Sequence, residues 1–271
     1  MISTNSFYNF VSINTILYLL ALFQYNLYIC IKQFNGLLIY FVFVSRNYFL
    51  INFVEYGTKH KPLIHKRDSL NLLTYYDLHF NVWRTTLIET ITHFYIESYI
   101  INKITNSTFI YEIAYFIPVS FIFEIIFDFF HYFAHRLLHH RLLYKYAHKI
   151  HHKFENPIAI ATFYQDPVDL LITNSFPTIL AFYLTSHITC LQITFIQYNL
   201  IIVYKSLIEI SGHCGRRLYP TSSFTQFIWL PKLTGIELYT EDHDLHHSQN
   251  NCNYGKRFSF WDKIFGTYKS Q

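Results

Sequence analysis

Long apolar stretches separated by short polar ones dominate the pattern of this chain. Residues 2–31 contain no charged side chain, and the run from Val11 onward is as long as the roughly 20 residues that cross a bilayer. Residues 34–54 are apolar apart from Arg46, and they predict either a second span or a segment at the membrane surface. A basic and polar loop, 57–68, then follows.

The next apolar stretch, residues 85–101, is interrupted by ionisable side chains at four-residue steps. Glu89, His93 and Glu97 would share one face of a helix at that spacing. We interpret this stripe as a wet or buried helix face, with a metal site as the alternative. Residues 109–130 are again strongly apolar and predict a further membrane helix.

Residues 170–204 carry no charged side chain at all. As one helix they would be about 52 Å long, far longer than the hydrocarbon core of about 30 Å. Two shorter spans that turn near residues 186–187 fit better, and Pro177 also permits a kinked or partly re-entrant version. A hairpin returns the chain to its starting side, so polar segments before and after it can meet.

The composition supports helices in lipid. The chain is 52% hydrophobic, 20% aromatic and only 14% charged, whereas soluble domains have about 25% charged residues. Its net charge of +4 is too small and too scattered to indicate a nucleic-acid partner. These features predict an all-α integral membrane bundle of about four transmembrane helices, with a helical cap at the membrane surface that begins at Ser211.

Basic residues predict which side of the membrane this cap occupies. They gather around the histidine-rich stretch and after the hairpin, and are Arg136, Arg141, Lys145, Lys149, Lys153, Arg216, Arg217 and Lys232. Because such residues favour the inner side of a membrane, we expect the cap to face the cytoplasm. The start of the chain lacks the basic region and the cleavage site of a removed signal peptide. The four cysteines form no CxxC pair and no disulfide framework.

Histidines provide the candidate chemistry. Three clusters stand out, HRLLH, HKIHH and HDLHH, which contain His135, His139, His148, His151, His152, His243, His246 and His247. Steps of three and four residues place side chains on one helix face, within reach of a shared ion. Eight imidazoles exceed the needs of one ion, so two ions are implied, but imidazole suits Zn, Fe, Cu and Ni alike. A structural or pH-sensing cluster is the alternative.

The surroundings of these clusters resemble the fatty acid hydroxylase superfamily, a membrane di-iron group that includes sterol desaturases and sterol methyl oxidases. Asp128 and Tyr132 precede His135 as in the D…Y…HR pattern of that family, and LYKYAHKIHH resembles its LYKxxHKxHH. Gly212-His213-Cys214-Gly215 resembles its GHxG element, and NYGKRFSFWDKIFGT (253–267) resembles its NYGxxxxxWDxxFGT ending. The resemblance covers residues 120–268.

This resemblance implies a catalytic domain at 111–268, preceded by apolar helices and a loop at 1–110. It implies two Fe ions held by the eight clustered histidines, which are also the catalytic residues, and His213 as a ninth ligand. Glu209 is either a ligand or an acceptor that orients His213. His131 is a ligand, a supporting residue or a packing residue.

Two further positions remain open. His140 is an alternative to His139 as the ligand, should the helix end be distorted. Asp166 stands where many relatives have histidine, and it leaves any further ligand there undecided.

The implied activity is the O₂-dependent oxidation of a C–H bond in a membrane lipid. We expect a sterol desaturase-like enzyme, with a fatty-acyl or sphingoid-chain hydroxylase as the alternative. A zinc-dependent membrane hydrolase and an inactive metal-binding relative are further alternatives. The chain has no GxGxxG motif, so electrons would come from a b-type cytochrome or an NAD(P)H-dependent reductase. The resemblance points to the endoplasmic reticulum or another intracellular membrane.

Overall fold

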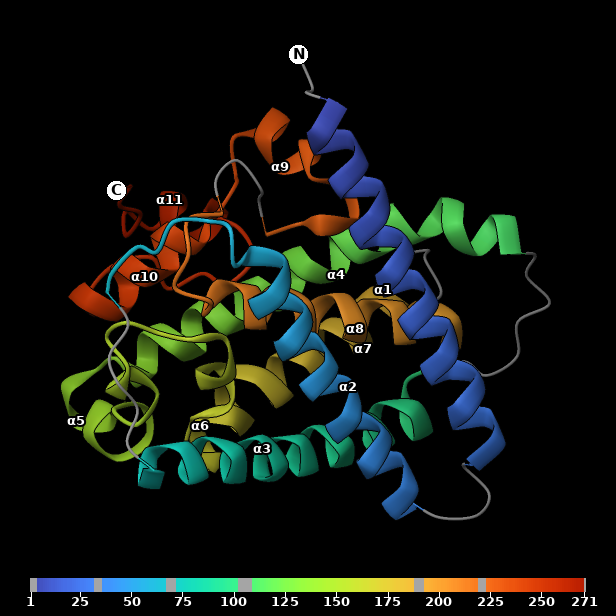
Figure 1. Cartoon of the computed structure of the whole chain (residues 1–271), viewed down its shortest axis with the longest axis horizontal. Coiled ribbons are helices and arrows are strands. Elements are labelled where there is room, and N and C mark those ends of the chain that lie inside the picture. Colours follow the sequence, from blue (N-terminus) through green and yellow to red (C-terminus); the bar gives the residue numbers. More distant parts are fainter. Residues whose placement is uncertain are drawn as a thin grey trace.

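A computed structural model describes residues 4–31, 36–66, 72–101, 109–187, 193–218 and 223–270. This part of the chain is helical and has no strand; one isolated bridge pairs Leu63 with Arg216. The elements (Figure 1) are α1 (Thr4–Ile31), α2 (Gly36–Thr58), α3 (Leu72–Tyr99), α4 (Phe109–Leu138), α5 (Arg141–Leu143), η1 (Tyr144–His148), η2 (His151–Lys153), η3 (Ala159–Phe163), α6 (Pro167–Leu170), η4 (Leu171–Ser175), α7 (Phe176–His187), α8 (Phe195–Gly212), η5 (Thr225–Phe227), α9 (Trp229–Thr234), α10 (Thr240–Gln249) and α11 (Phe260–Ile264).

Four helical segments of the described residues are long and apolar enough to cross a membrane. They are Phe7–Ile31, Gly36–Thr58, Ala114–Leu138 and Pro167–His187. The all-α membrane class expected from the sequence is therefore confirmed. Residues 34–54, which the sequence left open between a span and a surface segment, fall largely within the second of these.

The apolar run of residues 170–204 is divided into separate helices, as predicted. α7 ends at His187, so it still includes the expected turn at 186–187, and α8 begins at Phe195. Residues 188–192 lie outside the described part of the chain. Thr194 caps α8, because its hydroxyl accepts a hydrogen bond from the backbone of Gln197 and the Gln197 side chain bonds back to Thr194. α8 runs through the middle of the bundle (Figure 1) and packs against α1, α2 and α4.

The ionisable stripe on α3 faces the interior of the bundle. His93 and Glu97 are buried, and the Tyr198 hydroxyl lies 2.5 Å from Nδ1 of His93. Glu89 pairs with Arg46 of α2 at 3.5 Å. None of these residues belongs to a metal-binding group among the described residues, so the stripe is a buried helix face rather than a metal site.

Buried charges hold the C-terminal segment against the bundle. The Asp128 carboxylate on α4 accepts hydrogen bonds from the backbone of Lys256, Arg257 and Phe258 at 2.6–3.2 Å. Arg257 is fully buried; its Nε donates to Glu124 at 2.7 Å and its Nη2 to Glu209 of α8 at 2.8 Å. These contacts connect α4, α8 and the C-terminal segment, which all carry residues of the site described below.

Replacing Arg257 by Met should lower the free energy of unfolding by about 3–5 kcal/mol, because Glu124 would remain buried without its ion-pair partner and Glu209 would keep only its two lysine partners. The measurement is the denaturation midpoint of the purified protein in detergent. Arg141→Met is the matched control, since Arg141 is exposed at the start of α5. Equal shifts for the two variants would contradict a stabilising role for the buried pairs.

Candidate metal centre

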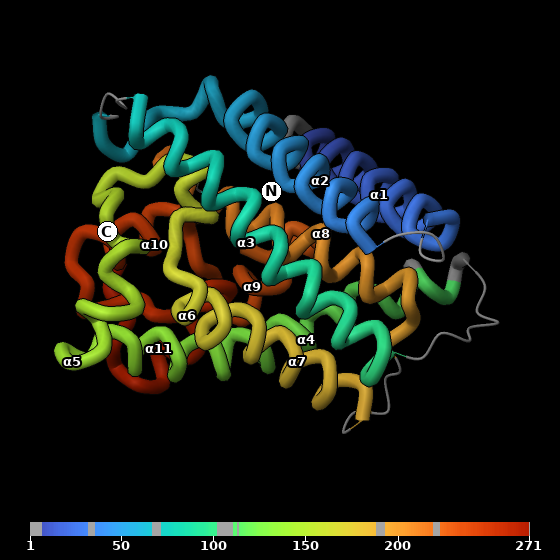
Figure 2. The backbone as a smooth tube through the Cα atoms, turned by 90° about the horizontal axis from the view of Figure 1, so that it is seen from below, coloured from blue at the N-terminus to red at the C-terminus, as the bar shows by residue number. Residues whose placement is uncertain are grey.

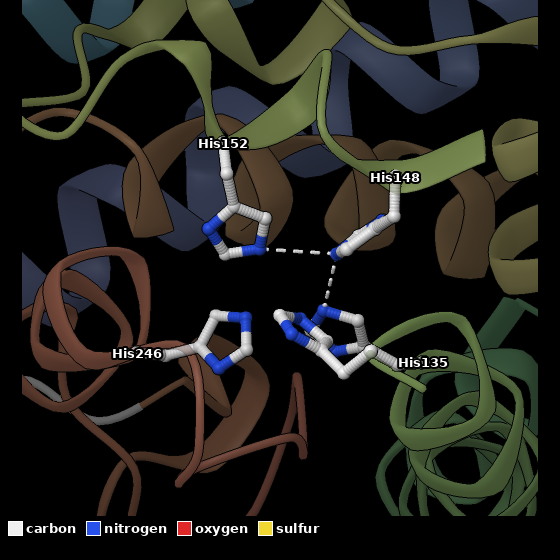
Figure 3. Close-up of side chains that lie close together, drawn as sticks. His135, His148, His152 and His246 are labelled. Atoms are coloured by element: carbon white, nitrogen blue, oxygen red, sulfur yellow. Dashed lines mark hydrogen bonds between the residues drawn. The ribbon is translucent and has the colours of Figure 1, made fainter. Parts of the chain in front are cut away.

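Nine buried or half-buried histidines form two adjacent groups, each able to hold one ion. The first histidine group is His135, His139, His148, His152 and His246; the second is His151, His213, His243 and His247. Within each group the candidate ligand atoms all lie within 4.8 Å of one another. These are the nine residues named from the sequence as metal ligands, and Figure 3 shows four members of the first group pointing toward a common centre.

The segment around HKIHH is not the regular helix that the spacing predicted. A π-helical turn, η1, ends at His148, and a 3₁₀ turn, η2, begins at His151. Such π turns are frequent at functional sites. The three histidines do not enter one group: His148 and His152 belong to the first group, and His151 belongs to the second.

The HDLHH segment is a regular α-helix, and its histidines are also shared between the two groups, with the groups exchanged. His243 and His247 of α10 belong to the second group, while His246 belongs to the first. Adjacent residues on an α-helix are about 100° apart, so His246 and His247 cannot point the same way. Each HxxHH segment therefore gives two histidines to one group and one to the other, which explains the repeated spacing.

Hydrogen bonds at Nδ1 fix the tautomers in the first group. His135 Nδ1 donates to the Tyr254 carbonyl at 2.9 Å, and His148 Nδ1 donates to the Asp169 carboxylate at 2.8 Å. Each neutral ring therefore has a lone pair at Nε2. These two Nε2 atoms lie 3.0 Å apart (Figure 3), and a hydrogen bond between them would need a proton that neither carries. Two facing lone pairs are suited to a shared cation.

The same arrangement recurs at His246 and in the second group. His246 Nδ1 donates to the Cys252 carbonyl at 2.7 Å, and its buried Nε2 has no hydrogen-bond partner among the described residues. His213 Nδ1 donates to the Glu209 carbonyl at 2.8 Å, and its Nε2 lies 3.1 Å from His243 Nε2. Two imidazoles bound to one ion at about 2.1 Å would be separated by about 3.0–3.4 Å. The donor set therefore fits a metal ion in each group.

Burial keeps most of these imidazoles neutral. Desolvation, reinforced in most cases by neighbouring histidines, lowers the pKa of His246 to about 3, of His213 to about 4 and of His139 to about 2. The same causes lower the pKa of His151, His152, His243 and His247. Neutral imidazole is the form that binds a metal, so the folded chain presents its ligands in the required state.

The positions that the sequence left open are placed as follows. The Glu209 carboxylate is paired with Lys205 and Arg257, and only its backbone carbonyl orients His213. His140 is exposed and outside both groups. His131 also lies outside them, and its Nδ1 donates to the Thr173 carbonyl at 2.6 Å. Asp166 caps α6 by accepting from the Val168 amide.

Asp169 contacts a histidine of the first group, and the sequence reasoning assigned it no role. It is buried at the start of the α6–α7 segment and accepts the Nδ1 proton of His148. An acidic residue at the edge of a long apolar stretch was the available signal. The carbonyls of Tyr254 and Cys252 gave no such signal in the sequence, because every residue has a backbone carbonyl.

An apolar cavity of about 420 Å³ leads to the second histidine group. Its walls include Ile13 and Ile16 of α1, Phe53 of α2 and Leu207 of α8, and its lining also includes His213, His243 and Lys256. This volume lies within the range of small-molecule sites. The cavity therefore joins surfaces of three long apolar helices to the candidate metal centre.

The model of the fatty acid hydroxylase family matches residues 119–267, which is more than half of the chain. The chain therefore belongs to the fatty acid hydroxylase family, as the histidine segments and the C-terminal pattern suggested. No solved structure matches the chain.

Curated relatives include two hydroxylases and a decarbonylase. The chain is 35% identical over 116 residues to the fatty acid hydroxylase vlmA of a Lecanicillium species, covering 42% of this chain and 31% of that one. It is 30% identical over 111 residues to cholesterol 25-hydroxylase of Rattus norvegicus, covering 41% and 33%. The very-long-chain aldehyde decarbonylase GL1-5 of Oryza sativa subsp. indica is 32% identical over 72 residues, covering 27% and 11%. The chain thus spans at most about a third of the length of these relatives.

Asp169→Asn should reduce metal affinity by about 10–100-fold, as loss of a partner that orients a ligand usually does. Metal content after dialysis against a graded chelator series measures this. Asp166→Asn is the matched control, because asparagine caps a helix as well as aspartate does. If both variants retain metal like the wild type, Asp169 does not orient His148.

The stability of the metal-free protein should fall as the pH drops from about 6.5 toward 4. Unfolded histidines take up protons near 6.5, whereas folded His213 does so only near 4, so the unfolded state binds more protons in this window. The stabilisation is fully present above pH 6.5. Denaturation midpoints across this range measure the slope, which should be shallower for His213→Gln. An unchanged slope in that variant would contradict the assignment.

Proposed function

We propose that this chain is a membrane-bound oxidoreductase that uses two iron ions and O₂ to oxidise a C–H bond of a lipid. The proposal rests on one observation with two parts. Two adjacent groups of histidines present imidazole lone pairs to one another, and an apolar cavity reaches the second of these groups. A hydrolytic zinc ion has about three protein ligands and an open position for water, so two such ions would not require nine imidazoles. Family membership supports the same conclusion.

The nine grouped histidines would hold the metal, with three or more ligands for each ion. Tyr254, Cys252 and Glu209 fix ring orientation through their carbonyls, and Asp169 does so through its carboxylate. When bound, the iron pair would supply the oxidising power that an unactivated C–H bond requires. The protein supplies position and an environment that excludes water.

Hydroxylation is the outcome we favour. The balanced reaction is R–H + O₂ + 2 e⁻ + 2 H⁺ → R–OH + H₂O. The named hydroxylase relatives support oxygen insertion over the sterol desaturation first expected from the resemblance. Because these relatives include a fatty acid and a cholesterol hydroxylase, an acyl chain and a sterol are both substrate candidates.

The remaining assignments follow from this activity. Electrons come from a b-type cytochrome or an NAD(P)H-dependent reductase. Residues 111–268 form the catalytic domain, while residues 1–110 add apolar helices that wall the cavity. The protein lies in the endoplasmic reticulum or another intracellular membrane, with the histidine groups facing the cytoplasm, as the basic residues near them favour.

Purified protein should contain close to two irons per chain and consume O₂ only with a reductant and a lipid. Lipid profiling of a sterol-oxidase-deficient host that expresses the chain should reveal a hydroxylated product and identify its class. Zinc as the activating metal, or turnover without O₂, would refute an oxygenase. If the host gained a sterol with a new double bond and no hydroxylated lipid, the result would favour sterol desaturation instead.

His139→Ala should lose both bound metal and activity, whereas His140→Ala should retain them. The two residues are adjacent, but only His139 belongs to a metal-binding group. Iron analysis and product yield of the two purified variants test this contrast. Loss of metal in the His140 variant alone would reverse the assignment.

A further inference from the structure

We propose that α3 also crosses the membrane and that its outward face contacts lipid acyl chains. Together with α8, it would bring the bundle to six crossings, two more than hydropathy identifies. The inference concerns the surface of the bundle and does not depend on the reaction.

The polarity of α3 is inverted relative to a water-facing helix. Its exposed side chains include Phe80, Trp83, Leu87, Ile91 and Tyr95, which are 39–64% exposed. Its buried side chains include Asn81, Thr85, Thr86, Thr90, His93 and Glu97. A helix at a water-facing surface buries its apolar stripe and exposes its polar one. The reverse pattern suits a helix with lipid on the outside and polar partners within the bundle.

The inward polar groups of α3 find partners inside the bundle. Thr86 accepts a hydrogen bond from the Asn47 amide of α2 at 2.8 Å, and Thr85 donates to the Phe163 carbonyl at 3.0 Å. His93 meets Tyr198 of α8. Polar groups within a membrane are expected to face the bundle and pair in this way.

α3 runs from the metal end of the bundle to the opposite end. In the first half of α3, Leu78 packs against Ala161 and Tyr164, and Arg84 donates to the Gln165 carbonyl at 2.7 Å. This segment is close in sequence to Asp169, which bonds His148. Near its end, His93 lies against Tyr28 of α1 and against α8 close to the start of that helix. In Figure 2, α3 extends along the same direction as α7.

The path of the chain requires this crossing. The last turn of α2 lines the cavity beside His213, so α2 ends on the metal side. α4 carries His135 in its last turn, so it too ends on the metal side and starts on the other. At its start, Glu112 accepts a hydrogen bond from Thr194, which caps α8, at 2.6 Å. If α2 and α4 both cross toward the metal side, α3 must carry the chain back between them.

The same reasoning applies to α8. The α6–α7 segment starts beside His148, through Asp169, and leads away from the metal side. α8 then returns the chain to His213. Its side chains are almost all buried, so neighbouring helices rather than lipid surround Lys205 and Glu209.

Length and surface continuity agree with a crossing. With 28 residues, α3 is about 42 Å long, enough for a hydrocarbon core of about 30 Å. The Tyr40 hydroxyl of α2 donates to the Trp83 carbonyl at 3.0 Å, and the Phe41 and Trp83 rings are 5.9 Å apart. Phe41 and Trp83 are both exposed. The exposed apolar face of α3 is therefore continuous with the exposed apolar face of the candidate span α2.

Nitroxide labels can test the lipid contact in reconstituted full-length protein. Leu87→Cys and Ile91→Cys would each be labelled in a background where Cys30 and Cys190 are Ser. Lys66→Cys, at an exposed position of the basic loop after α2, is the water-facing control. The labels on α3 should collide more often with O₂ than with a water-soluble nickel chelate, and the control should show the reverse. The lipid contact would be refuted if the nickel chelate reached the label at position 87 as readily as it reaches the control. It would also be refuted if labels at position 87 of two chains showed spin–spin coupling, because this face would then contact another copy of the protein.

A second measurement separates a crossing helix from one that lies along the surface. Leu73→Cys and Tyr99→Cys mark the two ends of α3, both exposed, and Tyr146→Cys marks the metal side. In sealed vesicles, a membrane-impermeant thiol reagent should reach positions 73 and 146 from one side and position 99 from the other. Labelling of 73 and 99 from the same side would refute the crossing. Neither readout needs bound metal or substrate.

Discussion

The structure depends on how nine imidazoles are kept neutral, buried and aimed at two points. Each buried ring has a single proton, and where a carbonyl or carboxylate accepts that proton at Nδ1, the lone pair at Nε2 is left facing its neighbours. In an apolar interior such facing lone pairs are costly unless a cation lies between them. The acceptors come from distant parts of the chain, so the site and the fold stabilise each other.

This requirement explains the position of the buried charges. Arg257 and Asp128 fasten the C-terminal segment to α4, and that segment presents the Tyr254 and Cys252 carbonyls to His135 and His246. Glu209 serves twice, with its carboxylate in the charge network and its carbonyl on His213. Asp128 and the NYG pattern are therefore parts of one assembly that orients the ligands.

Membership of the fatty acid hydroxylase family gives this assembly a chemical context. The cavity that reaches His213 is walled by helices with apolar outer faces, which is an arrangement suited to a substrate that arrives from the bilayer. The inverted polarity of α3 extends this relationship to the bundle as a whole. Its polar groups are satisfied inside, where hydrogen-bond partners exist, and its apolar groups are left for lipid.

The sequence by itself determined the helical membrane class, the division of residues 170–204 into separate helices and the nine histidines, because apolar length and ligand type are local properties. Only the tertiary structure decided which histidines belong together, because each group combines side chains from segments that are far apart along the chain. It also decided that Asp169 and two backbone carbonyls orient the ligands, and that Glu209 does so through its own carbonyl. Such contacts join residues far apart along the chain, and their pairing exists only once the helices are packed.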